Sequence, residues 1–338
     1  SSNSSFCVLQ PDATKVIIPV IYCILFVIGV LGNSISMWIF TRKITAKKST
    51  HIYLINLIFS NLLMCSVMPL QSAYFLMGHQ WTTTSLICII IMCFVVPVFH
   101  ANNYVNLITL SSIAISRYAI LVKHNESTGE TNSFVCSRII CDNVLKKFRD
   151  GKFAKRFSVA MWIIVVCTTL PLFLLYAFKE NKKQDETVCF NERFELRAKL
   201  SHTATIFATV FFLLCFLMVL VSYICVAKHV YKSQAHTSIK QNHLVYRKVL
   251  RNILFIQIVL SICFLPYHIF RPILITITQN KNCSTLNHLV EVKNLLFCLE
   301  ALRSSTDPFI YLTLDRTFQK HVHNLMRKVR SSFRSEMS

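Results

Sequence analysis

Charged residues, acidic ones above all, and glycine are scarce in this 338-residue chain. Asp, Glu, Lys and Arg together make up 15% of it, only 15 residues are acidic, Gly occurs 5 times, and 54% of the residues are hydrophobic. A single soluble core does not fit a chain this long and this apolar, so the composition predicts a membrane protein with several spans. Seven apolar runs are long enough to cross a bilayer. They cover about residues 16–40, 51–77, 86–115, 157–178, 202–227, 252–278 and 288–313.

Most of the 36 Lys and Arg residues lie in alternate connecting segments and in the C-terminal tail. Cytoplasmic loops of membrane proteins carry such an excess, which places the N-terminus outside the cell and the C-terminus inside. The net charge of +21 is then explained by topology and by contact with anionic membrane lipid, and not by nucleic acid. We expect an extracellular tail at 1–15, a seven-helix membrane domain at 16–314, and a cytoplasmic amphipathic helix with its tail at 315–338.

The 14 cysteines are of two kinds. Cys7, Cys88, Cys189 and Cys283 fall at or near the predicted outer ends, where disulfides form, and most of the others lie within spans as small hydrophobic residues. Two external bridges are therefore expected. The sequon that begins at Asn3 predicts glycosylation of the external tail.

Patterns typical of catalysis or metal binding are missing from the sequence. The His and Cys residues lack metal-ligand spacing, and no nucleophile, base and orienting acid assemble from the spans. We therefore expect a protein that is not an enzyme and that has no metal or other cofactor.

The sixth apolar run is interrupted by Pro266 and by the polar residues that follow it. Proline has no N–H and its ring collides with the carbonyl one turn back, so a kink is expected that frees backbone acceptors. Such groups must face protein or a water-filled cavity within a bilayer. Tyr267, His268 and Arg271 are therefore expected to line a cavity.

The third and seventh runs carry polar groups at membrane depth, which is costly and marks functional sites. The third run contains His100, Asn102, Asn103, Tyr104 and Asn106 and ends in Ser116-Arg117-Tyr118, and the seventh contains Glu291, Lys293, Glu300, Arg303 and Asp307. Arg303 is three residues from Glu300 and four from Asp307, so it can meet either acid along one helical face.

Short motifs follow one another along the seven runs. They are Gly32-Asn33, Trp81 with Cys88, Ser116-Arg117-Tyr118, Trp162, Tyr223, Cys263-Phe264-Leu265-Pro266 and Asp307-Pro308-Phe309-Ile310-Tyr311. On this conjunction the chain resembles a rhodopsin-like, class A G-protein-coupled receptor over nearly its whole length. Phe264 to His268 with Arg271, Lys293, and the pair Cys7 and Cys283 resemble the purinoceptor-like branch, and most closely its orphan members. The resemblance implies an all-α, seven-transmembrane-helix bundle with a short amphipathic eighth helix in the plasma membrane.

The resemblance implies that Cys88 bridges Cys189. Cys88 stands 29 residues before Arg117, about one turn farther than is usual in the family, whereas Cys93 stands 24 before it. The distance from Trp81 favours Cys88, and a bulge or extra turn is then expected near Pro97.

The resemblance also places the ligand site among the outer halves of the third, fifth, sixth and seventh helices. Arg271 and Lys293 can hold an anion such as a nucleotide or lysophospholipid. Alternatively, Arg271 reaches the outer headgroups and Lys293 pairs with Glu291. The expected ligand-binding residues are His100, Asn103, Tyr104, His202, Tyr267, His268, Arg271 and Lys293.

A third implied feature is a polar core formed by Asn33, Asn61, Asn106, Arg303 and Asp307. The family holds sodium here with a carboxylate on the second helix, where this chain has Asn61. We therefore expect Arg303 to take the place of sodium and to pair with Asp307, since a buried charge needs a partner.

At the cytoplasmic end, the resemblance implies that Arg117, Tyr118, Tyr223 and Tyr311 couple to the G protein. Ser116 replaces the acid that normally precedes the arginine, which removes a contact of the resting state and predicts raised basal activity.

The sequence thus predicts an orphan-type receptor that transduces an extracellular small-molecule or lipid ligand to heterotrimeric G proteins, of the inhibitory class by analogy, and that also binds arrestin. An atypical receptor that traffics or scavenges ligand without coupling is the alternative, given Ser116 and Asn61. A transporter or channel is disfavoured because the chain shows no internal repeat and no paired broken helices.

Overall fold

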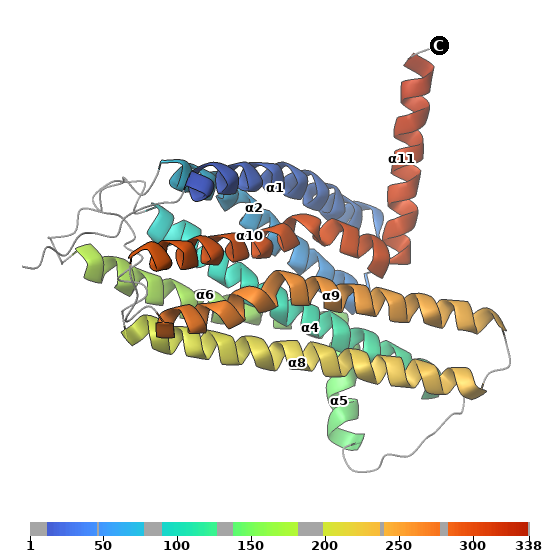
Figure 1. Ribbon diagram of the computed structural model, residues 1–338. Helices are drawn as coiled ribbons and strands as arrows, with labels where there is room; N and C mark the ends of the chain where they lie inside the picture. The colour runs from blue at the N-terminus through green and yellow to red at the C-terminus, as the bar shows by residue number, and fades with distance from the viewer. Residues whose placement is uncertain are drawn as a thin grey trace, which may run out of the picture.

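A computed structural model describes residues 12–45, 47–77, 90–126, 138–181, 199–236, 240–277 and 283–336, which are helical almost throughout (Figure 1). The long helices are α1 (Asp12–Trp38), α2 (Ser49–Leu76), α4 (Val96–Glu126), α6 (Gly151–Asn181), α8 (Lys199–His236), α9 (Lys240–Ile277) and α10 (Cys283–Leu314). The other elements are α5 (Arg138–Arg149), α11 (Arg316–Glu336) and two π-helical turns, η1 (Ile39–Lys43) and η2 (Ile91–Val95).

The seven long helices run side by side as one bundle, and α11 turns away from its end at a steep angle (Figure 1). α1 packs on α2 and α10, while α4 lies against α2, α6 and α8. The expected seven-helix bundle with an additional amphipathic helix is confirmed. α8 and α9 extend well beyond the apolar runs predicted at 202–227 and 252–278, because backbone hydrogen bonding continues a helix past the segment that hydropathy detects.

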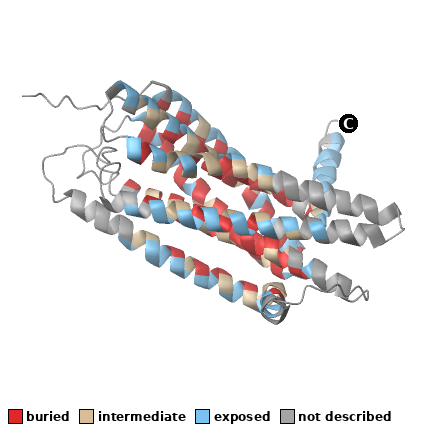
Figure 2. Ribbon diagram, turned by 60° about the horizontal axis from the view of Figure 1, so that its bottom comes forward, coloured by how far each residue is buried: buried red, intermediate tan, exposed pale blue. Residues whose placement is uncertain are grey.

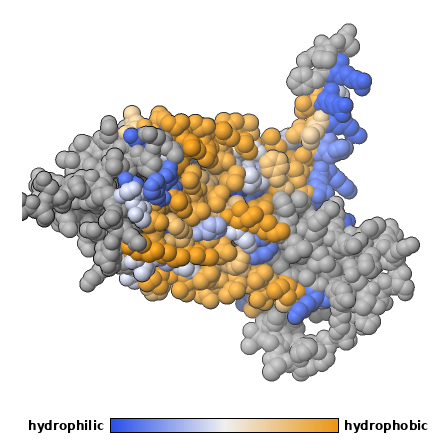
Figure 3. All heavy atoms as spheres, viewed as in Figure 1, coloured by the Kyte–Doolittle hydropathy of each residue, from blue (hydrophilic) through white to orange (hydrophobic). Residues whose placement is uncertain are grey.

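The sides of the bundle are apolar, as expected of a surface that faces lipid (Figure 3). Leu31, Ile164 and Phe207 are 60%, 62% and 73% exposed. Within the described residues, segments in α1 with η1, α2, α6 and α9 are long and apolar enough to span a membrane. α4 and α10 instead bring polar residues to the interior of the bundle. The chain is therefore a multi-pass membrane protein.

Buried residues line the facing sides of the helices (Figure 2) and form two large apolar clusters. One contains Phe40, Tyr53 and Phe318 near the end of the bundle where α11 begins, called here the α11 end. The other contains Tyr22, Phe75 and Phe99. Asn33, Asn61 and other polar residues are buried as well, so the interior of the bundle also contains polar side chains.

Close approach of α1 to α2 and α10 depends on two glycines. A Cβ atom on Gly29 would lie 2.4 Å from Cys65 Sγ and 2.9 Å from Ser305 Oγ, and one on Gly32 would lie 2.8 Å from Pro308 Cγ. Small residues let the backbones of membrane helices approach in this way.

The π-helical turn η2 ends two residues before Pro97. A π turn inserts one extra residue into a helix, so the bulge expected near Pro97 is present. Cys88 and Cys189 lie outside the described residues, as does the side chain of Cys93, so the disulfide pairing stays a prediction.

The long connection between the third and fourth spans contains α5. Arg149 donates a hydrogen bond to the carbonyl of Ala119 at 3.3 Å, and Phe148 packs on Tyr53 and Phe157. The described C-terminal part of this connection is therefore a helix docked on the bundle.

Candidate functional site

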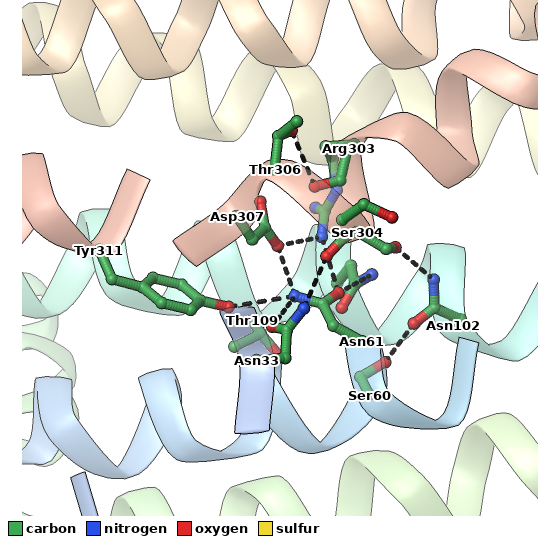
Figure 4. Close-up of polar contacts among 12 residues, drawn as sticks. Asn33, Ser60, Asn61, Asn102, Thr109, Arg303, Ser304, Thr306, Asp307 and Tyr311 are labelled. Atoms are coloured by element: carbon green, nitrogen blue, oxygen red, sulfur yellow. Dashed lines mark hydrogen bonds and ion pairs between the residues drawn. The ribbon is translucent and has the colours of Figure 1, made fainter. Parts of the chain in front are cut away.

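The polar core is built around an ion pair on α10. Arg303 Nη2 lies 2.7 Å from Asp307 Oδ2, and the two side chains are 0% and 1% exposed (Figure 4). The residues are four apart, so the helix places both on one face. The expected pairing of Arg303 with Asp307 is present.

The Asn61 amide connects this pair to neighbouring helices (Figure 4). Its Nδ2 donates to Asp307 Oδ2 at 2.7 Å and to the Tyr311 hydroxyl at 3.1 Å. Its Oδ1 accepts from Arg303 at 3.4 Å and from Asn106 at 3.3 Å. Helices α2, α4 and α10 therefore meet in one hydrogen-bonded network.

Two further contacts extend the network to α1 and α9. Asn33 donates to the backbone carbonyl of Ser304 at 3.0 Å, and the Arg303 guanidinium lies 5.0 Å from the centre of the Phe264 ring. Phe264 stands two residues before Pro266, so the buried cation contacts the helix in which a kink is predicted.

The expected ligand-binding residues lie toward the opposite end of the bundle from α11. Arg271 donates to the Tyr267 hydroxyl at 3.0 Å, one turn back on α9. The His268 ring stacks on Phe212 of α8 at 4.1 Å between centroids. Lys293 is 8% exposed on α10, which packs against α9.

The third helix contributes three of the expected residues to the same region. Tyr104 meets Phe211 edge to face at 5.7 Å, and His100 lies 6.4 Å from Phe297 between ring centroids. Asn103 donates a hydrogen bond to Glu300. The side chain of His202 lies outside the described residues.

Glu300 is the residue that sequence reasoning left out of the site. Its spacing allowed a pair with Arg303, but its carboxylate accepts from Asn103 and lies 3.8 Å from His268. Asp307 pairs with the guanidinium, and Glu300 contacts α4 and α9 instead. In the sequence, the acidic charge of Glu300 at membrane depth marked it as a candidate site residue. Its partners, Asn103 and His268, follow only from the packing of the helices.

Near the α11 end, the Ser116 hydroxyl is buried and hydrogen-bonded to hydroxyls of α2, at 2.9 Å from Ser49 and 3.4 Å from Thr50. Tyr311 joins the Asn61 network, while the side chains of Tyr118 and Tyr223 lie outside the described residues. Ser116 therefore links the motif of the third span to the start of α2.

A second contact at this end joins α2 to Asp315, the residue between α10 and α11. His51 Nε2 lies 2.8 Å from Asp315 Oδ2, and Asp315 Oδ1 accepts from the backbone N–H of Phe318 at 2.8 Å. Burial favours the neutral acid, but the hydrogen bonds from His51 and then from Phe318 outweigh it and lower the pKa of the Asp315 carboxyl.

The residues expected to carry the external modifications lie mostly outside the described residues. Asn3, Cys7, Cys88 and Cys189 lie outside the described residues, and Cys283 begins α10 with its side chain undescribed. Glycosylation and both disulfides stay predictions. Among the described residues, no group of three or more His, Cys, Asp or Glu could hold a metal ion.

The bundle, the polar core and the ordered motifs define a helical membrane receptor. The family model for the 7 transmembrane receptor (rhodopsin family) matches residues 32–141 and 138–311, and the chain belongs to this family. It is a receptor and not an enzyme, and its family implies an extracellular ligand and a G protein as partners.

Several proteins named as receptors are similar to this chain over nearly its whole length. Probable G-protein coupled receptor 82 of Homo sapiens is 41% identical over 331 residues, which cover 98% of this chain and 98% of the human protein. Probable G-protein coupled receptor 34 of Mus musculus is 24% identical over 337 residues, covering 99% of this chain and 83% of the mouse protein. Proteinase-activated receptor 2 of Rattus norvegicus is 26% identical over 338 residues, covering 98% and 77%.

Proposed function

We propose that this receptor recognises an anionic extracellular ligand, nucleotide-like or lysophospholipid-like, and passes the signal to heterotrimeric G proteins of the inhibitory class. The N-terminus is then extracellular, the C-terminus and α11 are cytoplasmic, and arrestin binds the same inner face. The excess of Lys and Arg on the proposed inner side supports this orientation.

The proposal of an anionic ligand rests on one observation. Arg271 is held by the Tyr267 hydroxyl at 3.0 Å, and Lys293 is buried on the adjacent helix. A guanidinium offers a planar fork of donors for phosphate or carboxylate, and an ammonium adds a compact charge. Both gain strength where water is excluded.

Guanine-nucleotide exchange on a purified inhibitory-class G protein tests this proposal. A panel of nucleotides and lysophospholipids is applied to the receptor and to its Arg271→Ala and Lys293→Ala variants. Potency of an active compound should fall at least about tenfold in each variant, the loss of one charged hydrogen bond. Lys155→Ala, an exposed position on α6, is the matched control. Unchanged potency in both site variants would rule out the anion site.

An atypical receptor that takes up ligand without coupling is the second candidate, favoured by Ser116 and Asn61 at positions where the family carries acids. Comparing basal exchange by the receptor and its Arg117→Ala variant, at matched surface expression, separates the two. Exchange that Arg117→Ala abolishes supports a coupling receptor. Ligand uptake and arrestin recruitment without exchange by either protein would favour the atypical one.

The ion pair of α10 supports a further element of the proposal, that Arg303 stands in for the sodium ion of related receptors. The guanidinium supplies a permanent charge to Asp307, and Asn61 contributes an amide where the family carries a carboxylate. A second mobile cation would meet repulsion from Arg303 without that carboxylate to attract it.

A further inference from the structure

Glu300 carries a buried carboxylate that the ion pair of Arg303 and Asp307 does not include. The side chain is 0% exposed, and its Oε2 accepts a hydrogen bond from Asn103 Nδ2 on α4. Among the residues that the structure describes, Oε1 has no hydrogen-bond partner. Burying an acceptor without a donor is unfavourable, and more so when the group is charged.

A second acceptor lies on the same amide. Asn103 is 7% exposed, and its Oδ1 also lacks a hydrogen-bond partner within the described part of the chain. The orientation of the amide follows from chemistry, because the nitrogen and not the oxygen must face the carboxylate. Glu300 Oε1 on α10 and Asn103 Oδ1 on α4 are therefore two buried acceptors without a donor among the described residues.

His268 on α9 is the third residue near these acceptors. Its Nε2 lies 3.8 Å from Glu300 Oε1, too far for a direct hydrogen bond, and a donor group that lies beside the two atoms can reach both. The ring lies nearly parallel to Phe212, at 9° and 4.1 Å, which holds its edge toward α10. A neutral imidazole can offer Nε2 as a third acceptor.

The nearest cation along α10 is paired with another acid through its Nη2, and its Nε and Nη1 have no hydrogen-bond partner among the described residues. Arg303 stands one turn beyond Glu300, but its guanidinium lies 2.7 Å from Asp307 and against the Phe264 ring. A donor-rich positive group entering between Glu300, Asn103 and His268 would meet acceptors from three helices.

We propose that Glu300, Asn103 and His268 form a subsite for a primary ammonium group of the extracellular ligand. Three N–H donors of such a group match the three acceptors, and its charge compensates the carboxylate. The assignment rests on the proposed ligand site, because Arg271, one turn from His268 on α9, would hold the anionic part of the same molecule. The ligand is then zwitterionic, with its ammonium directed toward the polar core.

Thermal unfolding of the purified receptor in lipid nanodiscs tests the subsite with methylammonium chloride. The methylammonium ion has one nitrogen with three N–H donors, bonded to a single methyl group. Compared with potassium chloride at equal ionic strength, methylammonium should raise the unfolding midpoint by about 2 °C or more. Glu300→Gln, nearly identical in shape, should abolish the rise. Glu291→Gln on the same helix, beside His288 at the partly exposed outer part of α10, should retain it.

Three outcomes would overturn the assignment. They are no rise in the native receptor, an equal rise in Glu300→Gln, and an equal rise with sodium chloride, which would make the group a metal site. If Glu300→Gln fails to fold, His268→Phe keeps the stacking on Phe212, removes the imidazole acceptor and should weaken the rise. The probe has no anionic group, so this result is independent of the Arg271→Ala test of the proposed function.

Discussion

The Arg303 guanidinium and the Asp307 carboxylate, one turn apart on α10, form an ion pair of 2.7 Å in the centre of the bundle. Asn61 donates hydrogen bonds to this carboxylate and to the Tyr311 hydroxyl, so the pair is part of the packing between α2 and α10. Removal of one charge would leave the other buried without its partner.

Single substitutions of this pair should destabilise the receptor far more than the double substitution. Arg303→Met or Asp307→Asn leaves an uncompensated buried group and should cost about 3–5 kcal/mol, whereas the double variant should recover most of the loss. Thermal unfolding of the four purified proteins gives the coupling energy. Additive losses would mean that the pair contributes no coupling.

The proposed role of Arg303 predicts insensitivity to sodium. Replacing potassium chloride with sodium chloride at constant ionic strength should leave the unfolding midpoint of the native receptor unchanged. The double variant Asn61→Asp, Arg303→Asn restores a carboxylate and removes the fixed cation, so its midpoint should rise in sodium. A sodium response of the native receptor contradicts the proposal.

Ser116→Asp should lower basal nucleotide exchange about fivefold, since an added resting-state contact of roughly 1 kcal/mol shifts the equilibrium toward the inactive form. The new carboxylate can also accept from the hydroxyls of Ser49 and Thr50, which bind Ser116 in the structure. Ser116→Asn has nearly the same shape without the charge and is the control. Equal exchange by both variants and the native receptor would leave no role for the missing acid.

Asp315 should stabilise the junction of α10 and α11 at neutral pH. Because its pKa is lowered in the folded protein, its contribution is present above the ordinary aspartate pKa of about 3.9 and is lost as pH falls through the lower folded value. Asp315→Asn should cost about 1 kcal/mol at pH 7 and flatten the loss of stability on acidification. Thermal unfolding between pH 7 and acid conditions measures both effects, with Asp150→Asn, an exposed helix cap, as control.

Gly29→Ala should destabilise the bundle by about 1–3 kcal/mol, because its Cβ atom would meet Cys65 Sγ at 2.4 Å and Ser305 Oγ at 2.9 Å. Gly151→Ala is the matched control, since its Cβ atom would lie 3.4 Å from Ile52 Cδ1 in ordinary contact. Adding Cys65→Ala to Gly29→Ala should restore part of the stability, as thermal unfolding would show. Equal effects of the two glycine substitutions would mean that α1 shifts without cost.

The spans and the family could be predicted because their signals are local. A lipid-facing helix must be apolar over about 20 residues, and the motifs at Asn33, Arg117, Pro266 and Asp307 occur in the order of the helices. The pairing of Arg303 with Asp307 could also be predicted from the sequence, since helical spacing alone brings positions four apart together.

The partners of Glu300 were decided only by tertiary structure. Arg303 was an equally near neighbour on the helix, but the acceptor group of Glu300 with Asn103 and His268 depends on how α4, α9 and α10 pack. The contact of His51 with Asp315 joins residues 264 positions apart for the same reason. Sequence by itself determined which segments enter the membrane, because that choice depends on each segment's own transfer from water to lipid. Which polar side chains meet inside was left to the packing of the helices, because residues distant in the chain become neighbours only when the bundle forms.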